Sequence, residues 1–186
     1  MGNFDVMLQR NKEFSAQQKS AGTLPPSLPE AMPGLKAFII GCADPRVDPV
    51  QILGLKNGEA VVLRNIGGRI TPGLLEQVGM LGRIGQVAGQ APGGGGEFHL
   101  IVMQHTDCGM TRLLNETQML AHYFQITDAD VSAKHVNDPR AAVRGDVAAL
   151  RAIPQLPAAW LLSGLVYDVT TGLVEVVVRP ALIRAA

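Results

Sequence analysis

The segment Ala37-Phe-Ile-Ile-Gly-Cys-Ala-Asp-Pro-Arg46 leads from a short apolar run straight into a cysteine, an aspartate and an arginine. A second segment, Leu100-Ile-Val-Met-Gln-His-Thr-Asp-Cys-Gly109, has a similar order, with an apolar run followed by a histidine and a cysteine. Short continuous apolar runs are typical of strands that are buried on both faces of a parallel sheet. The two segments therefore predict two buried strands, each followed by residues that carry chemistry.

Further patterns along the chain place these two strands in a sheet. Apolar runs at residues 60–63 and 160–162 predict two more strands, and helical patterns at residues 73–87 and 139–152 predict crossover helices. The last part of the chain predicts a closing hairpin with strands at residues 166–169 and 173–178. We therefore expect an α/β fold, in which a mostly parallel four-stranded sheet has an antiparallel C-terminal edge strand and helices on both faces.

The N-terminal part of the chain has a different composition. Residues 3–19 are polar with scattered apolar positions, which predicts one amphipathic helix with little core of its own to cover. Residues 21–34 contain four prolines, too many for a helix or an interior strand, and predict an extended connector. We expect a helical arm with its Pro-rich connector over residues 1–34, followed by an α/β catalytic domain over residues 35–186.

Charge balance and hydropathy narrow the class of protein. The 186 residues include 16 Lys and Arg and 16 Asp and Glu, so no excess of positive charge marks a nucleic-acid or anionic-membrane partner. No apolar stretch reaches the roughly 18 residues of a membrane span. The first residues have neither the basic start nor the apolar run of a targeting segment, so we expect a cytoplasmic protein. Two cysteines in that compartment are more often ligands, nucleophiles or core residues than a disulfide.

Cys42, His105 and Cys108 form a candidate set of metal ligands. Cys42 and His105 both follow predicted strands, and ligands bind at the carboxyl ends of strands in open parallel sheets. Cys108 can reach the same ion if a helix begins there, and the N-terminus of that helix would favour its thiolate. Zinc takes thiolate and imidazole ligands, and a catalytic site keeps its fourth position open for water. The set therefore predicts a catalytic zinc site.

A closed structural zinc site is the main alternative, and it needs a fourth cysteine or histidine. His99 precedes its predicted strand and so lies at the wrong end of the sheet. His122 and His135 belong to segments that the sequence pattern does not place. A fourth ligand from a histidine therefore stays an open alternative.

Asp44 and Arg46 follow Cys42 at alternate positions. In a turn after the strand, the carboxylate can face the metal and the guanidinium can hold the carboxylate. Two states are open: Asp44 ligates zinc and closes the site, or it pairs with Arg46 and leaves the site open. A simple surface ion pair, which contributes little energy, is the third interpretation.

These motifs resemble those of the β-class carbonic anhydrases. The family pattern Cys-x-Asp-x-Arg matches Cys42, Asp44 and Arg46, and the pattern His-x-x-Cys-Gly matches His105, Cys108 and Gly109. The segment from Val62 to Gly68 is similar to the family's Arg-Asn-Ala-Gly region, and the similarity spans roughly residues 36 to 178. Two residues depart from the family pattern: Pro45 replaces the usual Ser or Ala, and Gln104 stands where Gly is common. Neither departure removes a candidate ligand.

The resemblance implies a carbonate dehydratase, a zinc lyase. It would hold one Zn²⁺ per chain on Cys42, His105 and Cys108, use the Asp44 and Arg46 dyad in catalysis, and form a homodimer or a dimer-based higher oligomer. The N-terminal helix would embrace the partner subunit. Substrate-binding positions are expected at Gly67 and Gly68, which end the segment similar to the family's Arg-Asn-Ala-Gly region, and at Gly109, which follows Cys108.

The expected reaction is reversible hydration of carbon dioxide to bicarbonate and a proton by zinc-bound hydroxide. Hydrolysis of carbonyl sulfide or carbon disulfide on the same scaffold is the enzymatic alternative, because the same nucleophile would attack these linear molecules. A noncatalytic zinc or thiol protein is the alternative from another class. Nucleotide binding is disfavoured, because the glycine-rich stretch Gly89–Gly96 precedes a strand and lacks the Lys-Ser/Thr ending of a phosphate loop, and so predicts a surface turn.

Overall fold

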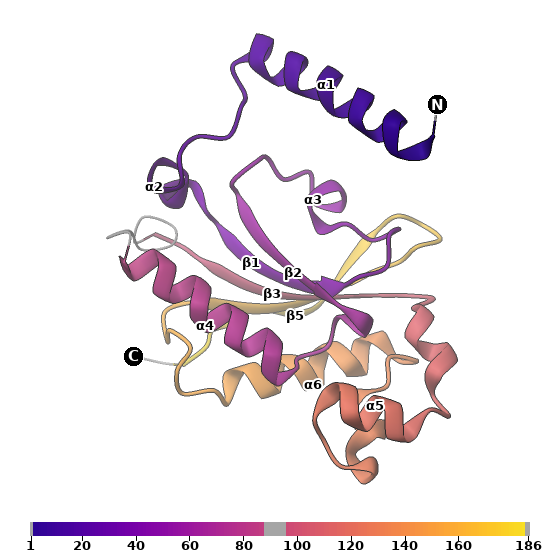
Figure 1. The fold of residues 1–186 in the computed structure, drawn as a ribbon. Helices are drawn as coiled ribbons and strands as arrows, with labels where there is room; N and C mark the ends of the chain where they lie inside the picture. The colour runs from indigo at the N-terminus through magenta and orange to yellow at the C-terminus, as the bar shows by residue number, and fades with distance from the viewer. Residues whose placement is uncertain (1, 88–95, 185–186) are drawn as a thin grey trace.

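A five-stranded sheet forms the centre of the computed structural model, which describes residues 2–87 and 96–184 (Figure 1). The strand order is β2-β1-β3-β4-β5, with β1–β4 parallel and β5 antiparallel to β4. The predicted mixed sheet is therefore confirmed. The strands are β1 (Ala37–Cys42), β2 (Ala60–Asn65), β3 (His99–His105), β4 (Leu161–Tyr167) and β5 (Val174–Leu182).

Apolar side chains project from both faces of the sheet, as the continuous apolar runs in the sequence predict. On one face, Phe38 and Ile40 belong to the main core together with residues of α4 (Pro72–Val87) and α6 (Pro139–Arg151). On the other face, Ile39 packs with residues in and just after α3 (Pro49–Ile52). Figure 1 shows α4 and α6 on one side of the sheet and α3 on the other. The predicted crossover helices and the cover on both faces are thus confirmed.

The C-terminal strands differ from the prediction in one respect. Separate strands were expected at residues 160–162 and 166–169, but a single strand, β4, crosses both regions. Gly164 in its middle is buried, and a Cβ there would lie 2.2 Å from Val143 Cγ1 on α6. Glycine here permits the close approach of α6 to the sheet, so it marks a packing contact and not the end of a strand.

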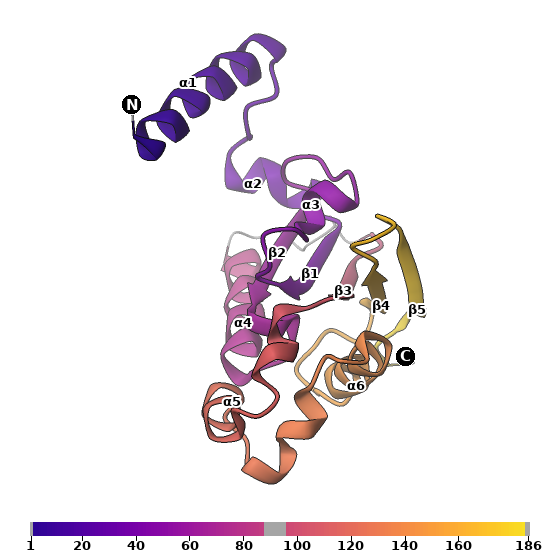
Figure 2. The same cartoon turned by 90° about the vertical axis from the view of Figure 1, so that its right-hand side faces the viewer.

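The N-terminal helix α1 (Asn3–Ala21) is present as predicted, and none of its residues is buried. It extends away from the sheet in both views (Figure 1, Figure 2). The connector was expected to be extended, but it contains the short helix α2 (Leu28–Ala31) and the 3-10 helix η1 (Met32–Gly34). Ser27 is the N-cap residue of α2, and the Glu30 carboxylate reaches back to accept hydrogen bonds from its amide N and Oγ at 3.1 and 2.8 Å. Proline is tolerated in the first turn of such a helix, which explains the incorrect prediction.

Short helical segments follow two of the strands. η2 (Ile66–Gly68) comes directly after β2, and η4 (Gly109–Leu113), α5 (Thr117–Phe124) and η5 (Asp128–Lys134) lie between β3 and α6. Within the described residues, no helix is both long enough and apolar enough to cross a lipid bilayer. The predicted surface turn at Gly89–Gly96 lies, except for Gly96, outside the described residues.

Candidate metal centre

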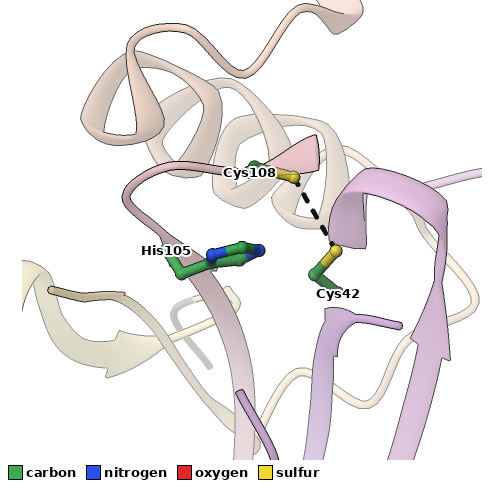
Figure 3. A group of neighbouring side chains, drawn as sticks. All are labelled: Cys42, His105 and Cys108. Atoms are coloured by element: carbon green, nitrogen blue, oxygen red, sulfur yellow. Dashed lines mark hydrogen bonds between the residues drawn. The ribbon is translucent and has the colours of Figure 1, made fainter. Parts of the chain in front are cut away.

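Three buried side chains meet at the carboxyl end of β1 and β3. Cys42 is the last residue of β1, His105 is the last residue of β3, and Cys108 leads into η4. Their ligand atoms all lie within 4.8 Å of one another (Figure 3). Sixty-six positions separate the two cysteines in the chain, but parallel pairing of β1 with β3 brings the two strand ends together. The three residues singled out in the sequence are therefore grouped in one place.

The geometry of this group fits zinc. The two Sγ atoms are 3.8 Å apart, and two Zn–S bonds of about 2.3 Å at a tetrahedral angle place sulfurs about 3.8 Å apart. His105 Nδ1 lies 2.9 Å from the Thr106 carbonyl oxygen. Because a carbonyl only accepts hydrogen bonds, Nδ1 carries the proton and Nε2 presents its lone pair. Nε2 is buried and has no hydrogen-bond partner among the residues that the structure describes, as expected of an imidazole prepared for a metal.

The two thiols influence each other's ionisation. The hydrogen bond between the sulfurs lowers the pKa of the Cys42 thiol, and it raises the pKa of the Cys108 thiol together with burial. His105 lowers the pKa of Cys42 further. A thiolate is the form that binds metal ions, so Cys42 is suited to receive a cation, whereas Cys108 would release its proton when a metal binds.

A fourth histidine ligand is not part of this group. His99 is the first residue of β3, at the opposite end of the strand, where its Nε2 lies 2.7 Å from Glu97 Oε1. His122 lies on α5, and His135 follows η5. Within the described residues, the ligand cluster contains the two cysteines and His105 alone. The arrangement thus offers three protein ligands, the number typical of an open site.

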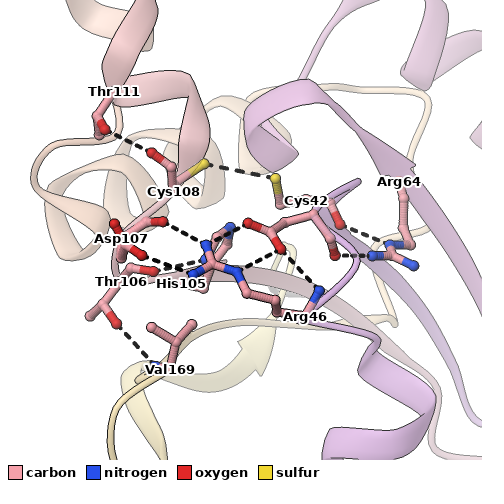
Figure 4. A network of polar contacts seen from close by, with 10 residues as sticks. Cys42, Arg46, Arg64, His105, Thr106, Asp107, Cys108, Thr111 and Val169 are labelled. Atoms are coloured by element: carbon pink, nitrogen blue, oxygen red, sulfur yellow. Dashed lines mark hydrogen bonds and ion pairs between the residues drawn. The ribbon is translucent and has the colours of Figure 1, made fainter.

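Asp44 is bound to Arg46 in this structure. Its Oδ1 accepts hydrogen bonds from the Arg46 backbone N at 2.9 Å and from Nε at 3.0 Å, and Oδ2 accepts from Nη2 at 2.7 Å (Figure 4). These hydrogen bonds lower the pKa of Asp44 to about 2. The carboxylate is therefore ionised near neutral pH and held beside Cys42.

Arg46 also binds a second carboxylate, that of Asp107, which the sequence pattern does not predict. Asp107 Oδ2 accepts from Arg46 Nη1 at 2.8 Å, and the Asp107 carbonyl oxygen accepts from Nη2 at 2.8 Å. Asp107 lies between two candidate ligands in the chain and has a φ of 52°, in the left-handed region that Asp tolerates better than most residues. Its position in the tight turn between His105 and Cys108 was the available signal.

The loop after β1 is also held by Arg64 on β2. The Arg64 Nε donates to the Cys42 carbonyl oxygen at 2.8 Å, and Nη2 donates to the Asp44 carbonyl oxygen (Figure 4). These bonds satisfy backbone acceptors at the end of a strand, where the sheet ladder no longer does so. The backbone that carries the candidate ligand and the carboxylate is thereby fixed.

A small cavity of about 310 Å³ opens beside this group. Gly67 and Gly109, two of the predicted substrate-binding glycines, line it. The third, Gly68, is buried and is not among its lining residues; a Cβ there would lie 2.7 Å from the Cys42 backbone N. The cavity is lined by Cys42, Ala43, Asp44, Pro45, Ile66, Gly67, Gly109, Met110 and Leu113.

Two further side chains fix the loop that forms one wall of the cavity. Gln104 is fully buried, and its Nε2 donates to the Gly68 carbonyl oxygen at 2.8 Å. Tyr123 Oη on α5 accepts a hydrogen bond from the Ile66 backbone N at 3.0 Å. In the sequence, Gln104 is recognisable only as a departure from the family pattern, and Tyr123 carries no signal, because nothing in the sequence shows that α5 packs on this loop.

Comparison with known proteins identifies the family. The family model described as carbonic anhydrase matches residues 37–174, which include both metal motifs and four strands of the sheet. The chain belongs to the β-carbonic anhydrase family. The prediction of a β-carbonic anhydrase, and with it of a lyase, is thus confirmed at the level of the family.

Individual β-carbonic anhydrases resemble this chain over most of its length. It is 27% identical over 169 residues to β-carbonic anhydrase 1 of Mycobacterium tuberculosis (strain H37Rv), which covers 90% of this chain and 93% of that protein. The crystal structure of carbonic anhydrase from Streptococcus mutans superimposes with a TM-score of 0.69 at 29% identity, covering 95% of this chain and 98% of the other. A carbon disulfide hydrolase of Acidianus sp. is 30% identical over 89 residues, 48% of this chain and 38% of that protein.

Proposed function

We propose that this protein catalyses the reversible hydration of carbon dioxide to bicarbonate and a proton, with one zinc ion on Cys42, His105 and Cys108. The observation that carries this proposal is the convergence of two thiols 3.8 Å apart with a buried imidazole nitrogen that has no partner among the described residues. Membership of the β-carbonic anhydrase family and the similarity to the mycobacterial enzyme support it.

The roles of the protein's own residues follow from their positions. Zinc in this site would supply Lewis acidity toward water, the chemistry that hydration of carbon dioxide needs. The three hydrogen bonds from Arg46 leave one acceptor position of the Asp44 carboxylate free, on Oδ2, so it can accept a hydrogen bond from the reacting water and orient it. The Thr106 carbonyl holds the His105 ring in one tautomer. The cavity beside Cys42 and Asp44 offers an apolar wall, formed by Ile66, Met110 and Leu113, to a small uncharged substrate.

Hydrolysis of carbonyl sulfide or carbon disulfide is the second candidate. The partial similarity to a carbon disulfide hydrolase favours it, and the same small cavity would accept a linear molecule of either kind. The chemistry would differ in its product, since hydrogen sulfide is released. Measurement of sulfide therefore separates the two activities.

The test is stopped-flow hydration of carbon dioxide by zinc-quantified protein from about pH 6.5 to about pH 9, with carbonyl sulfide and carbon disulfide in parallel. We expect fast hydration and one zinc per chain, and we expect Cys108→Ser to lose both. Zinc-loaded protein that releases sulfide but does not hydrate carbon dioxide would transfer the assignment to the second candidate. Silence on all three substrates would leave a noncatalytic zinc protein.

The homodimer, or dimer-based higher oligomer, is part of the same proposal. Helix α1 buries none of its residues within its own chain, and it exposes four large apolar side chains, Phe4, Met7, Leu8 and Phe14. A second subunit would cover them. Light scattering of the full-length protein tests this assembly, whereas the cytoplasmic location stays a prediction.

A further inference from the structure

Arg46 joins the two loops that carry the candidate ligands. Its Nε and Nη2 donate hydrogen bonds to Asp44, in the loop that follows Cys42 at the end of β1. Its Nη1 and a second Nη2 hydrogen bond reach Asp107, in the loop after β3 between His105 and Cys108. One guanidinium thus spans residues that are 61 positions apart in the chain.

The contacts on the two sides of Arg46 differ in what they can fix. Asp44 is only two residues from Arg46, so the pair could move together with their common loop. Asp107 belongs to the other loop, and both its carboxylate and its carbonyl oxygen hold the guanidinium at 2.8 Å. Because the guanidinium is planar, fixing Nη1 and Nη2 from Asp107 also fixes the direction in which Nε and Nη2 meet Asp44.

We propose that Asp107 is a positioning residue, which acts through Arg46 to hold the Asp44 carboxylate in the direction of the reacting water. This inference rests on the proposed function, since it assigns a further residue to the same site. The left-handed backbone at Asp107, with φ of 52°, turns its carbonyl oxygen to Arg46. A residue that accepts this backbone and carries a short side chain with an acceptor oxygen can make both contacts, and aspartate adds a negative charge that strengthens the contact with the guanidinium.

The test compares Asp107→Asn with Asp107→Gly and with a matched control. Asparagine keeps the size of the side chain and tolerates the left-handed backbone but removes the charge, and glycine keeps the backbone but removes the side chain. The control is Glu175→Gln, which removes another carboxylate from an arginine: Arg140 Nη2 and Glu175 Oε2 are 2.5 Å apart, and both side chains are 48% exposed. None of these exposed positions is expected to prevent folding.

We expect kcat to fall roughly three- to tenfold in Asp107→Asn, and further in Asp107→Gly, because loose orientation of a catalytic group lowers the rate of the chemical step. KM and zinc content should stay within about twofold of the parent values, and Glu175→Gln should match the parent protein. In an Arg46→Gln background, Asp107→Asn should have no further effect on kcat, because its action passes through the guanidinium. The proposal would be overturned if the double variant lost kcat by the product of the two single losses, or if kcat were unchanged in both Asp107 variants.

A spectroscopic measurement separates this inference from the proposed function. The Arg46 Nε–H signal in a ¹⁵N spectrum, assigned by its loss in Arg46→Gln, should exchange with solvent several-fold faster in Asp107→Asn than in the parent. Parent protein that hydrates no carbon dioxide while this exchange still changes would refute the function and keep the anchoring of Arg46. Active parent protein with unchanged exchange would refute the anchoring and keep the function.

Discussion

Two arginines bound by carboxylates have opposite environments in this molecule. Arg46 has 48% of its side chain exposed and lies at the candidate metal centre between Asp44 and Asp107. The Arg69 side chain is 3% exposed and is bound to that of Asp146 on α6, which is 1% exposed, at Nε–Oδ2 and Nη2–Oδ1 distances of 2.6 and 3.2 Å.

The two arginines therefore serve different purposes. Arg69 also donates to the carbonyl oxygens of His135 and Ala133, at 2.9 and 3.1 Å, so it ties the loop after β2 to the segment around η5 as well as to α6. A buried charge that loses its partner is costly, whereas an exposed ion pair contributes little to stability. We infer that Arg69 stabilises the fold around the site, whereas Arg46 fixes the direction of the Asp44 carboxylate within it.

The largest expected effect comes from breaking the buried pair. Asp146→Ala leaves the Arg69 guanidinium without its carboxylate, so the free energy of unfolding should fall by about 3 to 5 kcal/mol. Urea unfolding followed by circular dichroism measures it. The control Glu175→Ala removes an exposed carboxylate and should stay within about 0.5 kcal/mol of the parent protein. Equal effects of the two variants would contradict the division between the two arginines.

The next effect is on catalysis. Asp44→Asn keeps the shape of the side chain but removes the charge that orients water, so kcat/KM should fall roughly 100-fold, equivalent to about 2.7 kcal/mol. Zinc content and unfolding free energy should change little. Stopped-flow hydration, metal analysis and urea unfolding on one preparation check all three, and parallel loss of zinc and activity would mean that Asp44 helps hold the metal.

A smaller effect tests the loop that Arg69 follows. Tyr123→Phe removes the acceptor of the Ile66 amide hydrogen bond, so the free energy of unfolding should fall by about 1 kcal/mol. Hydrogen exchange at the Ile66 amide should become faster, while exchange within β3 stays unchanged. Unaltered exchange at Ile66 would show that Arg69 and Gln104 hold this loop without help from Tyr123.

The smallest effect concerns the stability contributed by the exposed network. A double-mutant cycle on Arg46 and Asp107, read out as unfolding free energy, should give a coupling of at most about 1 kcal/mol. A coupling of the size expected for the Arg69 pair would show that the exposed network also supports the fold. The contrast between the two arginines would then be one of degree.

The Arg46 contact to Asp44 was predictable from sequence, and the Arg69 contact was not. Arg46 and Asp44 are two residues apart, so local spacing after a strand is enough to suggest their pairing. Arg69 and Asp146 are 77 residues apart and meet only because α6 packs against the sheet near the loop after β2. No pattern in one sequence marks which buried arginine and aspartate will form such a pair.

The same distinction separates the correct and incorrect predictions elsewhere. The strands and the three candidate ligands follow from periodicity and from the rule that ligands bind at the carboxyl ends of parallel strands. The continuity of β4 through Gly164 depends on how closely α6 approaches, and the contact of Tyr123 with Ile66 depends on where α5 packs. Helix α2 was missed because the number of prolines outweighed the cap formed by Ser27 and Glu30.

The strand order has a consequence for how this chain folds. β1 lies between β2 and β3, and the chain between Cys42 and the other two candidate ligands, His105 and Cys108, includes β2 and α4. Closing so long a loop costs entropy that is recovered only when β3 pairs with β1. The three ligand atoms converge only in states in which β3 has paired with β1, so an ion that needs all three would bind the folded sheet in preference to a chain without this pairing.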